Sequence, residues 1–178
     1  MGRALPWLEV TTFDLRQARL RPGEEHRDEQ EIELALFDHG GQRYLPVPEK
    51  VPAELVISRG SSGTTFGLRF RARLHGPCVR CLKDAVVDLP VIAREYQATN
   101  PGEADELRTQ YVDENRLDLS AWARDAVALA LPEQILCRED CAGLCAVCGE
   151  DLNENPHEHA EERIDPRWAA LEELKEQL

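Results

Sequence analysis

The chain has 178 residues, of which 42% are hydrophobic and 31% are charged, and this balance is typical of a globular protein with one substantial core. Its formal net charge of −13 lies entirely in residues 101–178, which carry twenty acidic and seven basic side chains. Such an acidic half excludes uniform wrapping by nucleic acid, because it would repel the phosphates. There is no secretory signal pattern, and the apolar stretch 121–132 is too short for a bilayer. We therefore expect a cytoplasmic protein with no membrane partner.

We expect a single domain over residues 1–178, built from five successive segments. They are variable N-terminal strands and loops over 1–50, a β-hairpin sheet over 51–97, a helix over 117–132, a cysteine-rich module over 136–160 and a C-terminal helix over 165–178. In the first segment short apolar stretches alternate with charged ones, and Pro22-Gly23 marks a turn. Residues 51–58 are expected to form a strand.

The stretch 64–97 has the clearest strand pattern. Apolar residues recur at period two, and this places them on one face of a strand: Phe66, Leu68, Phe70, Ala72 and Leu74. The opposite face carries Arg69, Arg71, Arg73 and His75. The same period returns in Val87, Leu89, Val91 and Ala93. The sequence thus predicts a long antiparallel hairpin with Cys78 and Cys81 at its tip.

A helix is expected after this hairpin, because apolar residues recur near 3.6 spacing at Leu119, Trp122, Ala126 and Leu129. Asp118 or Ser120 can cap its N-terminus, and Pro132 ends it. A last helix begins at Asp165-Pro166, with Trp168, Leu171 and Leu174 on its apolar side. The predicted fold class is α+β, a mainly antiparallel β-sheet with one or two helices and a cysteine-rich zinc-knuckle module.

Six cysteines and two histidines form close pairs, and this spacing indicates metal ligands. The candidates are Cys78, Cys81, Cys137, Cys141, Cys145, Cys148, His157 and His159. In a reducing compartment clustered cysteines are more often metal ligands than disulfides. Zinc takes four such donors in a tetrahedron, and a C-x-x-C turn presents two thiolates to one ion. Eight donors in four pairs therefore predict one or two zinc ions.

The spacing leaves the grouping of these donors open. In the preferred arrangement Cys78 and Cys81 share an ion with Cys137 and Cys141, and the other four donors form a local second site. In the rival arrangement Cys78 and Cys81 join Cys145 and Cys148. The histidines, in an acidic polar stretch, could equally be solvated side chains. A metal-linked thiol sensor also stays open, although neither C-x-x-C stands at a helix N-terminus as a catalytic one usually does.

No enzyme signature is found in the sequence, neither a phosphate-binding Gly-rich loop nor a G-x-S-x-G or H-E-x-x-H motif. We expect a non-enzymatic protein without a small-molecule substrate. The basic strand face of Arg69, Arg71, Arg73 and His75, extended by Arg80 and Lys83, is a candidate RNA-binding surface. Same-face residues on a strand are about 6.6 Å apart, close to the spacing of phosphates, and arginine suits phosphate. The alternative is a solvated face with arginines paired to nearby acids.

The motifs CVRCL, ALALPEQILC and CREDCAGLCAVCGEDLNE together resemble the YceD family, described as large ribosomal RNA subunit accumulation proteins. The resemblance is most specific over residues 76–154, and residues 165–174 resemble the closing helix of the family. It implies a non-enzymatic bacterial factor that supports accumulation or processing of large-subunit ribosomal RNA and ribosome biogenesis. It also favours the preferred grouping, in which Cys78 and Cys81 share an ion with Cys137 and Cys141. At His157 and His159 this sequence departs from the family, whose members often have C-x-C there.

The expected partner is large-subunit ribosomal RNA or a basic ribosomal protein of that subunit. Two other functions remain open from the sequence. One is a redox- or zinc-responsive regulatory protein, which rests on the same cysteines. The other is an acidic adaptor that binds a basic ribosomal protein without touching RNA.

Overall fold

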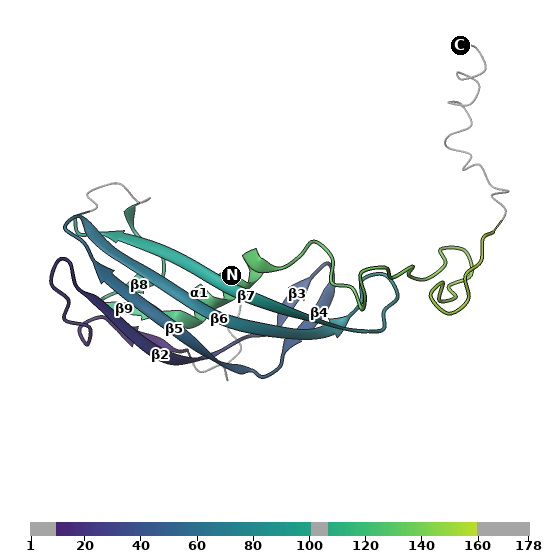
Figure 1. Ribbon diagram of the computed structural model, residues 1–178, viewed down its shortest axis with the longest axis horizontal. Coiled ribbons are helices and arrows are strands. Elements are labelled where there is room, and N and C mark those ends of the chain that lie inside the picture. Colours follow the sequence, from purple (N-terminus) through teal and green to yellow (C-terminus); the bar gives the residue numbers. More distant parts are fainter. Residues whose placement is uncertain (1–9, 101–106, 160–178) are drawn as a thin grey trace, which may run out of the picture.

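The computed structural model describes residues 10–100 and 107–159, and within them the chain forms two antiparallel sheets and one helix (Figure 1). The elements are β1 (Thr12–Asp14), β2 (Glu25–Glu33), β3 (Phe37–His39), β4 (Gln42–Pro46), β5 (Lys50–Arg59), β6 (Gly63–Pro77), β7 (Asp84–Ala98), β8 (Val112–Asp113), β9 (Arg116–Asp118) and α1 (Leu119–Ala130). The large sheet has the order β2-β5-β6-β4-β3, and β7 pairs with the other edge of β6. A small sheet has the order β1-β9-β8. The predicted α+β class is confirmed.

The long hairpin of β6 and β7 is the central element, and its register runs from Gly63 opposite Ala98 to Pro77 opposite Asp84. The predicted inward positions of β6 are all buried: Phe66, Leu68, Phe70, Ala72 and Leu74. Side chains alternate across a strand, so the intervening arginines lie on the outer face. The turn that carries Cys78 and Cys81 lies at the end of this hairpin (Figure 1).

Helix α1 packs against β7 and β2 on the inner side of the large sheet (Figure 1). It begins after Asp118, whose side chain accepts a hydrogen bond from the Ala121 N–H at 2.9 Å, as an N-cap does. The predicted helix is present, but Leu129, which follows the same 3.6 spacing, has a side chain that is 89% exposed. The buried face is centred on Leu119 and Ala126, and Leu129 lies just beyond its edge in the last turn. The predicted helix 165–178 lies outside the described residues.

Candidate metal centre

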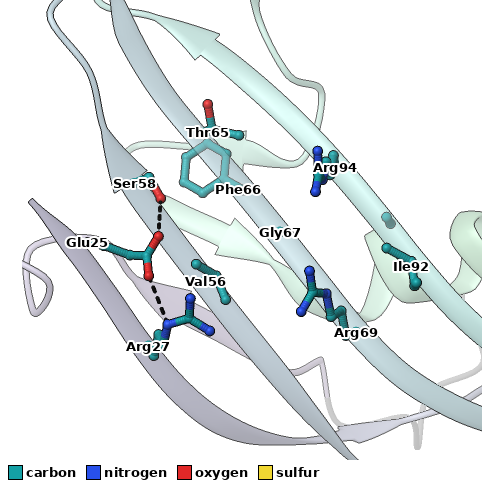
Figure 2. Close-up of a pocket in the computed structure, with 11 residues that line it drawn as sticks. Glu25, Arg27, Val56, Ser58, Thr65, Phe66, Gly67, Arg69, Ile92 and Arg94 are labelled. Carbon is teal, nitrogen blue, oxygen red and sulfur yellow. Dashed lines mark hydrogen bonds and ion pairs between the residues drawn. The ribbon is translucent and has the colours of Figure 1, made fainter. Parts of the chain in front are cut away.

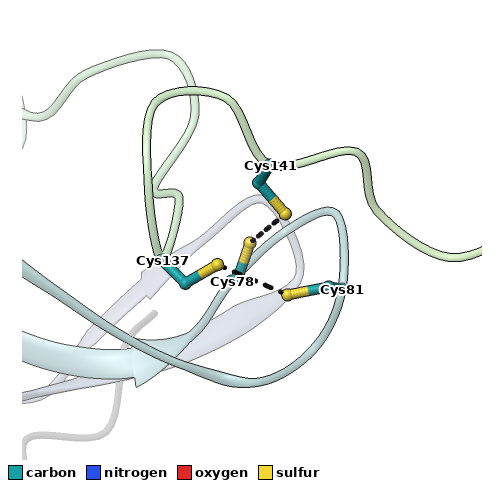
Figure 3. Close-up of side chains that lie close together, drawn as sticks. All are labelled: Cys78, Cys81, Cys137 and Cys141. Atoms are coloured by element: carbon teal, nitrogen blue, oxygen red, sulfur yellow. Dashed lines mark hydrogen bonds between the residues drawn. The ribbon is translucent and has the colours of Figure 1, made fainter. Parts of the chain in front are cut away.

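The turn after β6 presents the first cysteine pair. The Cys78 N–H donates to the Lys83 carbonyl at 2.7 Å, and the Leu82 N–H donates to the Cys78 carbonyl at 3.0 Å. Leu82 has φ of 61°, in the left-handed region that allows the chain to turn back. This tight turn points Cys78 and Cys81 toward the same space (Figure 3).

The segment 145–150 repeats this turn. The Cys145 N–H donates to the Glu150 carbonyl at 2.8 Å, and the Gly149 N–H donates to the Cys145 carbonyl at 2.9 Å. Gly149 has φ of 78° at the position equivalent to Leu82 in the first turn, and glycine adopts this conformation without steric cost. The two C-x-x-C segments are therefore the same backbone structure, a knuckle that presents two thiols.

Four cysteines converge at the hairpin tip, as Figure 3 shows. The Sγ atoms of Cys78 and Cys141 are 3.8 Å apart, those of Cys81 and Cys137 are 3.5 Å apart, and all four lie within 4.8 Å of one another. A disulfide needs about 2.05 Å. Four sulfurs at 2.3 Å from a tetrahedral zinc are about 3.8 Å apart. These separations fit four ligands of one metal ion.

Backbone hydrogen bonds prepare the first group for a cation. Burial raises the pKa of the Cys78 thiol, but backbone N–H groups of Cys81, Cys137 and Arg80 outweigh it and lower that pKa to about 6. The pKa of Cys137 is raised to about 12, first by its hydrogen bond with Cys81 and then by burial and the other thiols. Burial also raises the pKa of the Cys81 thiol, so a cation is needed to hold Cys81 and Cys137 deprotonated beside the Cys78 thiolate.

The second group consists of Cys145, Cys148, His157 and His159, whose ligand atoms also lie within 4.8 Å of one another. The Cys148 Sγ is 3.1 Å from Nε2 of His157. Nδ1 of His157 lies 2.8 Å from the Asn155 carbonyl, which can only accept, so Nδ1 carries the proton. Nε2 is then left with its lone pair toward the thiols, as in metal-bound histidines.

The thiol environment of the second group is similar to that of the first, but more open. Backbone N–H groups of Cys148 and Val147 lower the pKa of the Cys145 thiol to about 6. The Asn155 carbonyl, and then Cys145, raise the pKa of His157. Cys148 is exposed and Cys145 is half-buried, whereas Cys78 and Cys141 are buried. The grouping is the one preferred from the sequence.

Two of the predicted RNA-binding cations are engaged at the metal centre. The Arg80 guanidinium donates to the Cys141 carbonyl at 3.0 Å and to the Gln134 side chain at 3.2 Å. Lys83 forms an ion pair with Asp151 at 2.6 Å and a second with Glu154. The Lys83 ammonium lowers the pKa of Asp151 to about 2. Sequence reasoning missed these contacts, because the partners are at least 54 residues away along the chain and meet Arg80 and Lys83 only in the fold.

The other four predicted cations lie on the outer face of β6. Arg69 is 3.7 Å from Glu54 and Arg73 is 3.8 Å from Asp88, so both have weak, exposed ion pairs. For Arg71 no side-chain partner is found among the described residues. His75 is half-buried, near the metal end of the strand.

A shallow cavity of about 270 Å³ opens on this outer face, above Gly67 (Figure 2). Arg27, Arg69 and Arg94 line it from three strands, together with Ile92, which is 68% exposed. Arg94 lies opposite Gly67 in the hairpin register. Arg27 and Arg94 were missed in the sequence, because only the pairing of β2, β5, β6 and β7 brings them beside Arg69.

This fold and site define a class of protein: an antiparallel β-protein with two clusters of cysteine and histidine donors. Either cluster could hold a metal ion. The family described as "Large ribosomal RNA subunit accumulation protein YceD" matches residues 66–175. The chain belongs to this family.

Its curated relatives are described as uncharacterized. The uncharacterized protein Rv2926c of Mycobacterium tuberculosis is 40% identical over 148 residues, covering 80% of this chain and 67% of the relative. ML1660 of Mycobacterium leprae is 38% identical over 151 residues, which cover 75% of this chain and 69% of the relative. YlbN of Bacillus subtilis is 26% identical over 149 residues, which cover 82% of this chain and 83% of the relative. No solved structure matches the chain. Among the described residues, no helix has the length and apolar character to span a membrane.

Proposed function

We propose that this protein is a cytoplasmic, non-enzymatic zinc-binding factor that supports accumulation and processing of large-subunit ribosomal RNA. The family description supports the link to the large ribosomal subunit. One observation carries the proposal that the protein binds metal: Cys78 and Cys81 converge with Cys137 and Cys141. Cys81 and Cys137, the nearest of these in sequence across the two pairs, are 56 residues apart. Thiols from distant segments gather in this way when one ion holds them.

Zinc fits both donor sets better than the hard cations do. Thiolates and imidazoles are the ligands zinc prefers, whereas magnesium and calcium take oxygen ligands. Cys78, Cys81, Cys137 and Cys141 would hold one ion, and Cys145, Cys148, His157 and His159 would hold the other. Four protein donors at each site leave no open position for a reacting group, so the metal would supply stability and not catalysis.

The outer face of β6 and β7 is the proposed contact with RNA. Arg69, Arg71 and Arg73 stand about 6.6 Å apart along β6, and Arg94 adds a fourth guanidinium from β7. Their ion pairs are long and exposed, so phosphates can replace the carboxylates at low cost. On this face Glu29, Glu31 and Glu54 lie on β2 and β5, whereas the carboxylate on β7 nearest the arginines is Asp88, beside Arg73. RNA would therefore lie along β6 and β7 and away from β2.

A charge reversal tests this contact. Arg69, Arg71 and Arg73 are changed together to Glu, and binding to large-subunit ribosomal RNA is measured over a range of salt concentrations. Each lost phosphate contact should reduce the salt slope by about 0.7 to 0.9, so the triple variant should lose about two to three units of slope and bind much more weakly. The control is Arg16, Arg21 and Arg124 changed to Glu, which makes the same change in net charge at other sites. Equal affinity and slope in the two variants would refute the RNA contact.

A redox- or zinc-responsive role is the second candidate, and the exposure of the second group favours it. Cys148 is exposed, and its half-buried partner Cys145 has a thiol pKa lowered to about 6, so Cys145 supplies the thiolate that an oxidant would attack. This function predicts that mild oxidant releases one metal reversibly and changes the affinity for RNA. If the metal stays bound under oxidant that modifies other exposed thiols, the regulatory role is wrong.

A further inference from the structure

We propose that the two metal sites are coupled, and that Asn153 couples them: an ion in the second group strengthens binding of an ion in the first about tenfold. This inference rests on the proposed function only in that both groups bind a metal ion. It concerns the segment 149–156, which joins the knuckle of the second group to its histidines and lies against the first group.

The Asn153 side chain holds the loop that carries the last ligand of the first group. Its Nδ2–H points at the Cys141 Sγ at 3.6 Å. Its Oδ1 accepts hydrogen bonds from the Ala142 N–H and from the Arg138 guanidinium, each at 2.8 Å. Ala142 and Arg138 flank Cys141 on either side. A single amide from the segment 149–156 therefore fixes the backbone around Cys141 and donates toward its sulfur.

Further contacts keep this segment in place. Asp151 accepts from both the backbone N–H and the side chain of Asn153, so the amide has one orientation. Asp151 also pairs with Lys83, which directly follows the first knuckle. The Leu152 N–H donates to the Gly143 carbonyl at 2.9 Å. The segment thus spans from the second knuckle to the first through ion pairs and backbone bonds.

An ion in the second group would fix both ends of this segment. Cys145 and Cys148 precede it and His157 and His159 follow it, so four ligands on one ion close it into a short loop. Closing the loop restricts the conformations open to Asn153, and less entropy is then lost when Asn153 orders the first group. Binding at one site and binding at the other must strengthen each other by the same factor.

The size of the effect follows from what outer-shell hydrogen bonds contribute. Loss of a partner that orients a metal ligand costs about 10- to 100-fold in metal affinity. Asn153 is one such partner of Cys141, and the closed loop only favours its bound position. We therefore expect the low end of this range, about tenfold.

The test uses Co²⁺ as the probe in the full chain, because its absorption separates a four-thiolate site from a two-thiolate, two-imidazole site. The first-group affinity is measured against a competing chelator in the unmodified protein, in Cys148→Ser, in Asn153→Ala and in both together. We expect a fall of about tenfold in each single variant and no further large fall in the double variant. Asn100→Ala, an exposed asparagine beyond the opposite end of the hairpin, should leave the affinity unchanged.

Asn153→Asp keeps the acceptor oxygen and the size of the side chain, but it removes the N–H donor and adds a negative charge beside the thiolates. It should lower the affinity of the first group for Co²⁺ at least as much as Asn153→Ala does. Because it keeps the size of the side chain, this loss would not come from a loosened loop. First-group affinity unchanged in Cys148→Ser, or additive losses in the double variant, would overturn the coupling while leaving two metal sites in place. Failure of the unmodified protein to bind Co²⁺ at all would instead overturn the metal sites themselves.

Discussion

Loss of zinc from the first group should destabilise the protein more than loss of zinc from the second. The two groups differ in how far apart their ligands lie along the chain. Cys81 and Cys137 are 56 residues apart, whereas Cys148 and His157 are 9 apart. An unfolded chain can gather the second set of ligands easily, and zinc that also binds the unfolded chain stabilises the fold less. A zinc ion in the first group would therefore be the more selective for the folded state.

Loop closure gives the size of this difference. The cost of bringing loop ends together grows as 1.5 RT ln n, so the longer loop costs the unfolded chain about 1.6 kcal/mol more to close than the shorter one. For a domain of this size, 1 kcal/mol shifts the midpoint of thermal unfolding by about 2–4 °C. With zinc in excess, Cys137→Ser should therefore unfold about 3–6 °C below Cys148→Ser.

Both substitutions are at exposed cysteines, so neither removes core packing. Thermal unfolding is followed by circular dichroism, with zinc and again with a strong chelator. The gap between the variants should be present with zinc and should vanish with the chelator, because without metal there is nothing left to bind selectively. A Cys148→Ser variant that is equally or more destabilised in zinc would refute the reasoning.

Two further predictions concern thiol reactivity and packing. In the metal-free protein, the rate of alkylation of Cys145 should rise with pH through about 6 and then level off, because its thiol pKa is lowered to about 6. Cys137 is exposed, but it should react slowly at pH 7 because its pKa is raised to about 12. Peptide mass spectrometry measures both, and faster modification of Cys137 would contradict these pKa directions. Gly76→Ala should cost about 1–3 kcal/mol, since its Cβ would lie 2.7 Å from the Arg43 carbonyl oxygen. Gly67→Ala, whose Cβ meets its nearest atom at 3.7 Å, should leave the free energy of unfolding nearly unchanged, and an equal loss in both variants would be inconsistent with the packing.

The hairpin could be predicted from the sequence because one physical signal dominates it. Alternation at period two over Phe66 to Leu74 marks a strand with one buried face, and the structure buries those residues. The exposure of Leu129, near the end of α1, could not be predicted in the same way. Leu129 fits the helical period, but which part of an apolar arc is covered depends on the position of the helix against β7 and β2, and spacing does not contain that information.

The cysteine pairs were likewise visible as candidate ligands, but their grouping was not settled by spacing. Distance along the chain says nothing of which pairs meet, and the fold brings Cys141 to Cys78 across 63 residues. The contacts of Arg80 and Lys83 with the metal centre were hidden for the same reason. Their partners, the Cys141 carbonyl and Asp151, belong to segments that meet them only after the hairpin and the cysteine-rich module fold together.

The most direct test of the central claim, that this is a zinc protein with two sites, is the zinc content of the purified chain by native mass spectrometry. Two zinc ions per chain are predicted, falling to one in Cys148→Ser. One ion in the unmodified protein, still present in Cys148→Ser, would remove the second site. A purified chain that contains no zinc would contradict the account.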